Sequence, residues 1–312
     1  MSKPTIVFMG TPEFAVYSLD ILTAYEYPVI GVITQPDRPK GRGQALTPSP
    51  VKVFAEQRHL TVFQPDKVRN AEFLSLFREL SPDLVVVAAF GQILPREILE
   101  GPKMGCINVH PSLLPEYRGA APINWSLIRG AEKTGVTIMR MDEGMDTGDI
   151  LIQEETMIET DESYGMLHDH LAKMGAELLI KTIDMMQQGL CQRTPQNNSL
   201  ATYAPRLKKE DGLIRWDSDI HSIVDLIRGL SPTPCAYTFF KGKKLKIFSA
   251  TGKAGPVEVN AGKLHQETDK GLSVAAKNGW VYLKDVQLES KKRMSIQDFL
   301  RGSIISPEDT VG

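Results

Sequence analysis

Residues 106–115 read CINVHPSLLP. A short apolar run carries two polar side chains, Asn108 and His110, and then ends in a proline-bounded turn. Side chains two positions apart in an extended chain point to the same side. The apolar residues between and before them are typical of a buried strand. The stretch therefore predicts a strand that brings a carboxamide and an imidazole to one edge of a sheet.

Apolar runs of strand length recur through the first half of the chain, at residues 5–9, 29–33, 83–89 and 106–109, and residues 135–141 and 150–158 are expected to extend the sheet as a further pair. Helical patterns at residues 70–80 and 121–129 lie between such runs, and a long helix is expected over residues 163–188, ending at Gly189. This alternation predicts an α/β fold with a Rossmann-like open, mostly parallel sheet covered by helices on both faces.

The C-terminal third follows a different pattern. Residues 191–199 are polar without a hydrophobic period and predict a linker. Beyond them comes one helical pattern at 218–230, and then short alternating strands at 236–240, 245–249, 271–275 and 280–284. Short strands punctuated by Gly indicate a small β-barrel. We predict a catalytic domain over residues 1–189, a linker over 190–206 and a second domain over 207–312.

Composition limits the class of protein. The 312 residues are 42% hydrophobic and 24% charged, which is ordinary for a globular protein of about two domains. Cys106, Cys191 and Cys235 are few and far apart, so neither a disulfide framework nor a zinc site is expected. No apolar run has the length of a signal peptide or a membrane span. We expect a cytoplasmic protein, a monomer, with no metal and no membrane partner.

A second turn-rich segment supplies a carboxylate. Residues 142–149 read DEGMDTGD and lie between two predicted strands. Ligands of open α/β sheets bind outside the carboxyl ends of the strands, so Asp146 is expected at the same rim as Asn108 and His110. An amide, an imidazole and a carboxylate are the groups needed to hold a carbonyl, stabilise an oxyanion and move a proton. No Cys or Ser stands out as a nucleophile, which favours direct group transfer.

Other interpretations of the polar motifs are weaker. A calcium loop at 142–149 fails because Gly144 stands where an oxygen ligand is needed. His168 and His170, two apart on a predicted helix, face different directions and are interpreted as surface residues. Gly10 does not begin a Gly-x-Gly-x-x-Gly fingerprint, so a nucleotide cofactor is disfavoured.

The run Asn-x-His-x-Ser-Leu-Leu-Pro-x-x-Arg-Gly, followed by Asp-x-Gly-x-Asp-Thr-Gly-Asp, resembles the 10-formyltetrahydrofolate-dependent formyltransferases. The resemblance extends from residue 5 to about residue 230. Residues 34–50 are most similar to the family members that act on initiator methionyl-tRNA. The resemblance implies formyl transfer from 10-formyltetrahydrofolate to the α-amine of methionine on initiator tRNA, and it implies that the C-terminal β-barrel is OB-like.

The resemblance also implies roles for particular residues. Asn108, His110 and Asp146 match the catalytic residues of the family. The folate site is expected at Phe90, Gly91, Gln92, Ile93, Leu94, Ser112, Leu113, Leu114, Pro115, Asp142 and Gly144. Contacts with tRNA are expected from Arg38, Lys40, Arg42, Lys208, Lys209, Lys241, Lys243, Lys244 and Lys246.

Charge gives independent support for a nucleic-acid partner. Residues 206–312 hold 18 Lys and Arg against 13 Asp and Glu, although the whole chain has a net charge of −2. Residues 34–50 form a long basic loop with Gly on both sides of Arg42, as a finger entering a nucleic-acid groove would need. A solvated charged surface explains the same composition.

Two other functions stay open at this stage. The same chemistry on a nucleotide-sugar amine, or on glycinamide ribotide, would use the same catalytic residues. A non-enzymatic RNA-binding protein on a decayed transferase scaffold is the alternative from another class, and the intact set Asn108, His110 and Asp146 argues against it.

Overall fold

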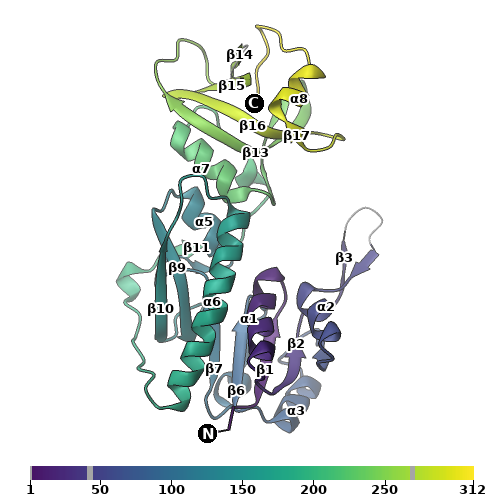
Figure 1. Cartoon of the computed structure of the whole chain (residues 1–312), viewed down its shortest axis with the longest axis vertical. Helices are drawn as coiled ribbons and strands as arrows, with labels where there is room; N and C mark the ends of the chain where they lie inside the picture. The colour runs from purple at the N-terminus through teal and green to yellow at the C-terminus, as the bar shows by residue number, and fades with distance from the viewer. Residues whose placement is uncertain (1, 41–44, 268–270) are drawn as a thin grey trace. The chain divides into compact units, whose positions relative to one another are not determined.

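The computed structural model describes residues 2–40, 45–267 and 271–312 (Figure 1). Its contacts divide the chain into two compact units that interleave along the sequence. The first unit comprises Met1–Gly119, Thr134–Thr156 and His168–Tyr203, and the second comprises Ala120–Lys133, Met157–Leu167 and Ala204–Gly312. The predicted boundaries at residues 189 and 207 stay a prediction.

The first unit is built on a seven-stranded sheet with the order β10-β9-β7-β6-β1-β2-β5. Its strands are β1 (Ile6–Gly10), β2 (Val29–Ile33), β5 (Val62–Phe63), β6 (Leu84–Ala88), β7 (Cys106–His110), β9 (Lys133–Arg140) and β10 (Ile150–Met157). From β5 to β7 all neighbours are parallel, and β9 joins β7 antiparallel. The prediction of a mostly parallel sheet is confirmed.

Helices cover this sheet because the strand side chains alternate between two apolar faces. Val7 and Met9 of β1 pack in one cluster with Phe73 and Phe77 of α3 (Ala71–Leu80) and with residues of α4 (Arg96–Glu100). On β7 the intervening side chain Val109 lies against α6 (Tyr164–Gln187), where a Cβ on Gly175 would be only 2.7 Å from it. The remaining helices of this unit are α1 (Glu13–Ala24) and α2 (Pro50–Gln57).

Residues 34–50, expected to be a loop, contain a short hairpin of β3 (Arg38–Lys40) and β4 (Ala45–Thr47). Asp37 anchors its base, accepting hydrogen bonds from Lys52 Nζ and Gln64 Nε2, each 2.7 Å long. The hydrogen bond from Lys52 is the main cause of the lowered pKa of Asp37. The two strands, Arg-Pro-Lys and Ala-Leu-Thr, are too short to show a hydrophobic period, so their pairing could not be predicted from sequence.

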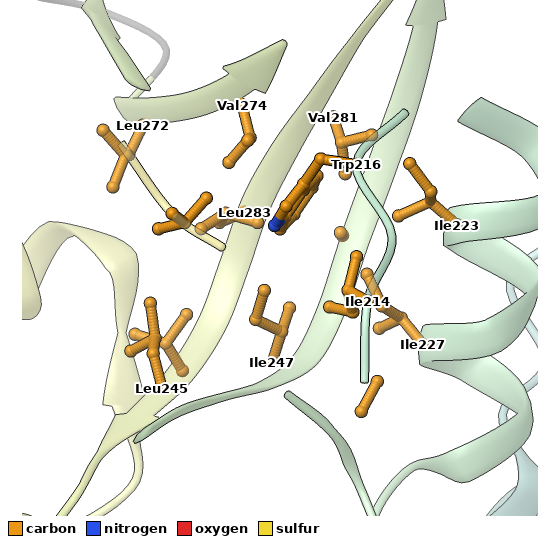
Figure 2. Close-up of a cluster of buried hydrophobic side chains, with 14 of the residues drawn as sticks. Ile214, Trp216, Ile223, Ile227, Leu245, Ile247, Leu272, Val274, Val281 and Leu283 are labelled. Carbon is orange, nitrogen blue, oxygen red and sulfur yellow. The ribbon is translucent and has the colours of Figure 1, made fainter. Parts of the chain in front are cut away.

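The second unit contains α5 (Pro122–Ile128) and α7 (Ile220–Leu230), with a six-stranded antiparallel sheet. The sheet strands are β12 (Ala236–Phe240), β13 (Lys243–Ala254), β14 (Leu264–Glu267), β15 (Gly271–Ala276), β16 (Gly279–Leu288) and β17 (Met294–Ser295). Figure 2 shows its core: Ile223 and Ile227, one helical turn apart on α7, face the alternate side chains of the strands across Trp216. The buried Trp216 indole donates to Thr238 Oγ1 at 3.0 Å.

The predicted OB-like barrel is not confirmed by the strand pairings. Among the described residues the sheet runs from β12 to β14, and these two edge strands do not pair with each other. The C-terminal residues lie along both edges instead, with Val311 bridged to Phe240 and Thr310 bridged to Lys263. The short elements that remain are β8 (Arg118–Gly119), β11 (Tyr203–Ala204), α8 (Ile296–Arg301) and two 3₁₀ helices, η1 (Asn198–Leu200) and η2 (Glu210–Gly212).

Asp83 joins the starts of β1 and β6, and its loss should show as a pH-dependent change in stability. Its Oδ2 accepts from the Thr5 amide and hydroxyl, each at 2.9 Å, and these bonds lower the pKa of Asp83. A lowered pKa contributes stability above the unfolded-state pKa near 4, and this contribution is lost as pH falls through the folded-state pKa. We expect Asp83→Asn to cost about 1 kcal/mol at pH 7 and progressively less in acid. Urea unfolding of both proteins from pH 7 to pH 3 measures this, and a pH-independent difference would contradict it.

Candidate active site

The site residues converge at the carboxyl end of β7. Asn108 and His110 are 8% and 4% exposed, and they share the face of the sheet that α3 and α4 cover. Asn108 is opposite Val87 of β6 and Met139 of β9, so the strand is fixed on both sides. The sequence-based prediction that these two side chains point the same way agrees with this register.

The carboxamide of Asn108 is unusual for a group so nearly buried. Its Oδ1 and Nδ2 make no hydrogen bond within the described parts of the chain. Both atoms keep some contact with solvent. Buried amides are normally hydrogen-bonded, because leaving one unpaired costs about 1–3 kcal/mol. A donor and an acceptor are therefore held ready for a ligand at this position.

His110 is flanked by two acceptors. Its Nε2 lies 3.2 Å from the Tyr117 carbonyl oxygen, and its Nδ1 lies 3.8 Å from Asp146 Oδ2. The second distance is too long for a hydrogen bond and leaves Nδ1 without a partner among the residues described. An imidazolium has one donor for each direction, so the ring can bond to Tyr117 and still donate from Nδ1 to a bound atom.

Asp146 is held in place by the backbone. Its Oδ2 accepts from the Gly119 amide at 2.8 Å, which turns the carboxylate toward His110. Its φ of +53° is in the left-handed region, which Asp and Asn tolerate better than most residues. The side chain is 18% exposed and so reaches solvent. Asn108, His110 and Asp146, which were singled out from sequence, are thus brought to one rim.

The turn after β7 is rigid. Thr137 Oγ1 on β9 donates to the Ser112 carbonyl at 2.6 Å and accepts from the Leu114 amide at 3.1 Å. Gln153 of β10 donates to the Leu114 carbonyl at 2.8 Å. Ser112 and Leu114 are buried, so they shape the turn, whereas Leu113 and Pro115 are partly accessible.

The predicted folate segments lie on two loops of the first unit. In residues 90–94, Phe90 and Leu94 are buried while Gly91 and Ile93 are exposed, Ile93 by 87%. The Phe90 carbonyl accepts from Thr11 and Gln35, so the loops after β1, β2 and β6 meet there. The side chain of Gln92 accepts a hydrogen bond from the Val68 amide at 3.0 Å and so joins this loop to the segment that contains Val68.

The other loop is folded around Asp142. Its carboxylate accepts from the Gly144 amide and the Thr147 hydroxyl, at 3.0 and 2.8 Å. Both Asp142 and Gly144 are exposed. A Cβ on Gly144 would come within 2.0 Å of Thr147 Oγ1, so a larger residue there would displace the Thr147 hydroxyl.

The predicted tRNA residues are divided between the two units. Arg38 is exposed on β3, Lys40 ends that strand, and Arg42 lies outside the described residues. In the second unit Lys241 is paired with Asp309 at 3.0 Å, which uses its charge. Lys208, Lys209 and Lys243 are exposed, and Lys244 and Lys246 are partly exposed on one side of β13.

Three features at this rim have no counterpart in the sequence-based prediction: the Tyr117 carbonyl, the Gly119 amide and the side chain of Gln196. Two of them are backbone groups within the quoted motif, so residue type gave no signal for them. Gln196 lies in the predicted linker and donates to the backbone of Asp146 at 2.8 Å.

The cysteines are not activated. Burial raises the pKa of Cys106 far above its ordinary value and that of Cys235 to about 11, and it also raises the pKa of Cys191. All three are therefore thiols at neutral pH. No helix of the described chain is long and apolar enough to span a bilayer, and no three His, Cys, Asp or Glu among the described residues could hold a metal ion.

A cavity of about 230 Å³ lies elsewhere in the first unit. It is lined by Met104 and Arg140, at the start of β7 and the end of β9, and it contains none of the predicted site residues. Burial and the neighbouring Arg193 lower the pKa of Arg140 there. The rim holding Asn108 and His110 is at the opposite end of β7.

Comparison with known proteins agrees with this geometry. Residues 4–183 match the formyl transferase family, and residues 206–303 match its C-terminal domain. The chain belongs to the formyl transferase family. A methionyl-tRNA formyltransferase of Syntrophus aciditrophicus is 55% identical over the full length of both chains, and one of Geotalea uraniireducens is 50% identical over 100% of this chain and 99% of the other.

Two solved structures share the fold of this formyl transferase. A methionyl-tRNA formyltransferase from Clostridium thermocellum superposes with a TM-score of 0.57 at 18% identity, over 91% of this chain and 98% of that one. The N-formyltransferase from Helicobacter canadensis, solved with folinic acid and dTDP-3-aminofucose, gives 0.65 at 18% identity over 94% and 100%. The resemblance predicted from the motifs is confirmed at the level of the family.

The left-handed backbone of Asp146 predicts which substitutions the loop accepts. Asp146→Asn keeps an oxygen acceptor and a side chain suited to positive φ, so its stability should stay close to wild type. Asp146→Val should lose about 1–2 kcal/mol, because a β-branched residue is strained there. Urea unfolding of both, with Glu143→Val as a control at an exposed neighbouring position, checks this. Equal stability of the Val and Asn variants would show that the strain is absent.

Proposed function

We infer that this formyl transferase moves the formyl group of 10-formyltetrahydrofolate to the α-amine of methionine on initiator methionyl-tRNA. Full-length relatives at 55% and 50% identity bear the name methionyl-tRNA formyltransferase. The observation that carries the chemistry is that the carboxamide of Asn108 and Nδ1 of His110 have no hydrogen-bond partner among the residues that the structure describes. Two donors on one side of a strand suit an oxyanion.

The amine of methionine attacks the formyl carbon, and negative charge develops on the formyl oxygen. Asn108 Nδ2 and the Nδ1–H of protonated His110 donate to this oxygen. Asp146, 3.8 Å from Nδ1, stabilises the charged ring. A water bound to Asp146 takes the proton of the attacking amine. The bond from the formyl carbon to N10 then breaks as the carbonyl reforms, and N10 receives the proton.

We place the folate between two loops of the first unit. The accessible residues of segment 90–94, Gly91 and Ile93, would meet the pteridine on one side. Asp142 and Gly144 would line the other side. The mainly buried residues beside these loops would support the pocket from the protein interior. They are Phe90, Leu94 and the turn formed by residues 112–115.

A second surface suits nucleic acid. On β12 and β13, Tyr237 and Phe239 pair across the strands with Lys246 and Lys244. The two rings meet edge to face, and Lys244 Nζ is 3.8 Å from the centre of the Tyr237 ring. Aromatic rings with adjacent cations bind nucleic acids by stacking and phosphate contact. We propose that this face of an OB-like domain binds tRNA, together with the basic residues around β3 in the first unit.

The protein would work as a monomer in the cytoplasm, where charged initiator tRNA and reduced folate are present. A formylation assay with initiator methionyl-tRNA and, in parallel, with a nucleotide-sugar amine tests the substrate. Product on the tRNA alone is expected. Product on the sugar amine alone would favour the alternative member of the family, which shares the fold with a TM-score of 0.65.

The oxyanion role predicts a large kinetic defect for Asn108. We expect Asn108→Ala to lower kcat by roughly 10²–10³, because one donor to the developing charge is lost. The KM for the folate should change little, since the amide binds the transition state more than the ground state. Steady-state formylation kinetics, with the melting temperature as a control for folding, measure both. A loss of less than tenfold would contradict the role.

The basic aromatic face predicts a salt-dependent defect. Replacing Lys244 and Lys246 with Ala should raise the KM for tRNA. It should also make the slope of log(kcat/KM) against log(salt concentration) shallower, by the amount that corresponds to about two lost phosphate contacts. The exposed Lys277 on another turn of the same unit gives a matched control, Lys277→Ala. Unchanged KM in the double variant would remove this face from the proposal.

A further inference from the structure

Arg118 directly precedes Gly119 and is a buried cation. The residue is 2% exposed, and no carboxylate lies within ion-pair distance of it in the part of the chain that is described. A buried charge is expensive unless hydrogen bonds satisfy it. Its partners are two neutral amides: Gln196 Oε1, at 3.0 Å from Nε and 2.7 Å from Nη2, and Asn198 Oδ1, at 2.8 Å from Nη2.

The other end of the Gln196 amide holds the loop that carries Asp146. Its Nε2 donates to the Asp146 carbonyl at 2.8 Å and to the Gly148 carbonyl at 2.7 Å. The guanidinium must face an oxygen and the carbonyls must face a nitrogen, so only one orientation of the amide satisfies all four bonds. The charge of Arg118 thereby orients Gln196, and Gln196 orients the loop.

Asp146 is therefore held from two directions by adjacent residues. Arg118 acts on its backbone through Gln196, and the Gly119 amide bonds directly to its carboxylate. The peptide amide of Arg118 also donates to the Thr202 carbonyl at 2.9 Å, which keeps the strand pair β8 and β11 together. A residue at positive φ needs such outside support to keep its conformation.

Glutamine is the side chain that this position requires. A glutamate at position 196 would form an ion pair with Arg118, but it has no N–H for the two carbonyls. An ion pair with Arg118 would therefore favour Glu at position 196, whereas the two loop carbonyls need the N–H groups of Gln. Gln196 also lies between the two ranges that match the family, residues 4–183 and 206–303.

We propose that Arg118 and Gln196 are positioning residues that hold Asp146 in register with His110. This inference rests on the proposed function, because it assigns the role of Asp146 to catalysis. The part of the inference that does not depend on a substrate is structural: the neutral amide of Gln196, rather than a carboxylate, lies beside the buried guanidinium and fixes the backbone of residues 146–148.

The test compares Gln196→Glu with Gln192→Glu, which makes the same charge change at an exposed position of the same segment. We expect Gln196→Glu to melt within a few degrees of wild type, because an ion pair replaces the lost bonds. Its kcat should fall by about tenfold to a hundredfold, since a misplaced catalytic group costs on that order. Gln192→Glu should match wild type. A wild-type kcat in Gln196→Glu would overturn the inference.

A double-variant cycle separates this inference from the proposed function. If Gln196 acts through Asp146, then Gln196→Glu should cause no further loss of kcat in an Asp146→Ala background. An equal loss in both backgrounds would assign Gln196 a general structural role and overturn the inference. If Asp146→Ala alone is fully active, the proposed function of Asp146 fails, whereas an Asp146→Ala variant of low but measurable kcat beside a fully active Gln196→Glu removes only the positioning role.

Discussion

The register of β7 is the constraint on which the site depends. The strand is fixed by parallel pairing with β6 and antiparallel pairing with β9. Side chains alternate along it, so a slip by one residue would turn Asn108 and His110 toward α6 and bring Val109 to the rim. The close approach of Gly175 to Val109 makes that exchange sterically costly. Packing on the apolar face thus determines where the polar face presents its groups.

The polar groups at the rim fall into two classes. Gln153 donates to Thr137 Oγ1 and to the Leu114 carbonyl, and Thr137 donates to the Ser112 carbonyl, so these groups are satisfied and make the turn after β7 rigid. Those of Asn108 and His110 Nδ1 have no partner in the described ranges of the chain and are left open to a ligand. A rigid, satisfied frame around a few unsatisfied donors is what electrostatic preorganisation requires, because the donors need not reorganise during the reaction.

The second unit contains a sheet whose two edge strands, β12 and β14, do not pair with each other among the described residues. Its C-terminal residues bond to Phe240 on one edge strand and to Lys263 beside the other, which covers strand edges that would otherwise be free to pair. Its buried face packs on α7, and its other face presents Tyr237 and Phe239 among lysines. Covered edges and one exposed basic face suit a module that binds a polyanion without aggregating.

Local pattern was enough to predict the parallel sheet, the strand 106–109 and the group of Asn108, His110 and Asp146, because hydrophobic period and turn residues act over a few positions. Only the tertiary structure decided which cations are already paired, as Lys241 is, and that Gln196 of the predicted linker supports the loop of Asp146. Those contacts join residues up to 68 positions apart for Lys241 and 50 for Gln196, and no periodicity along the chain records such distances.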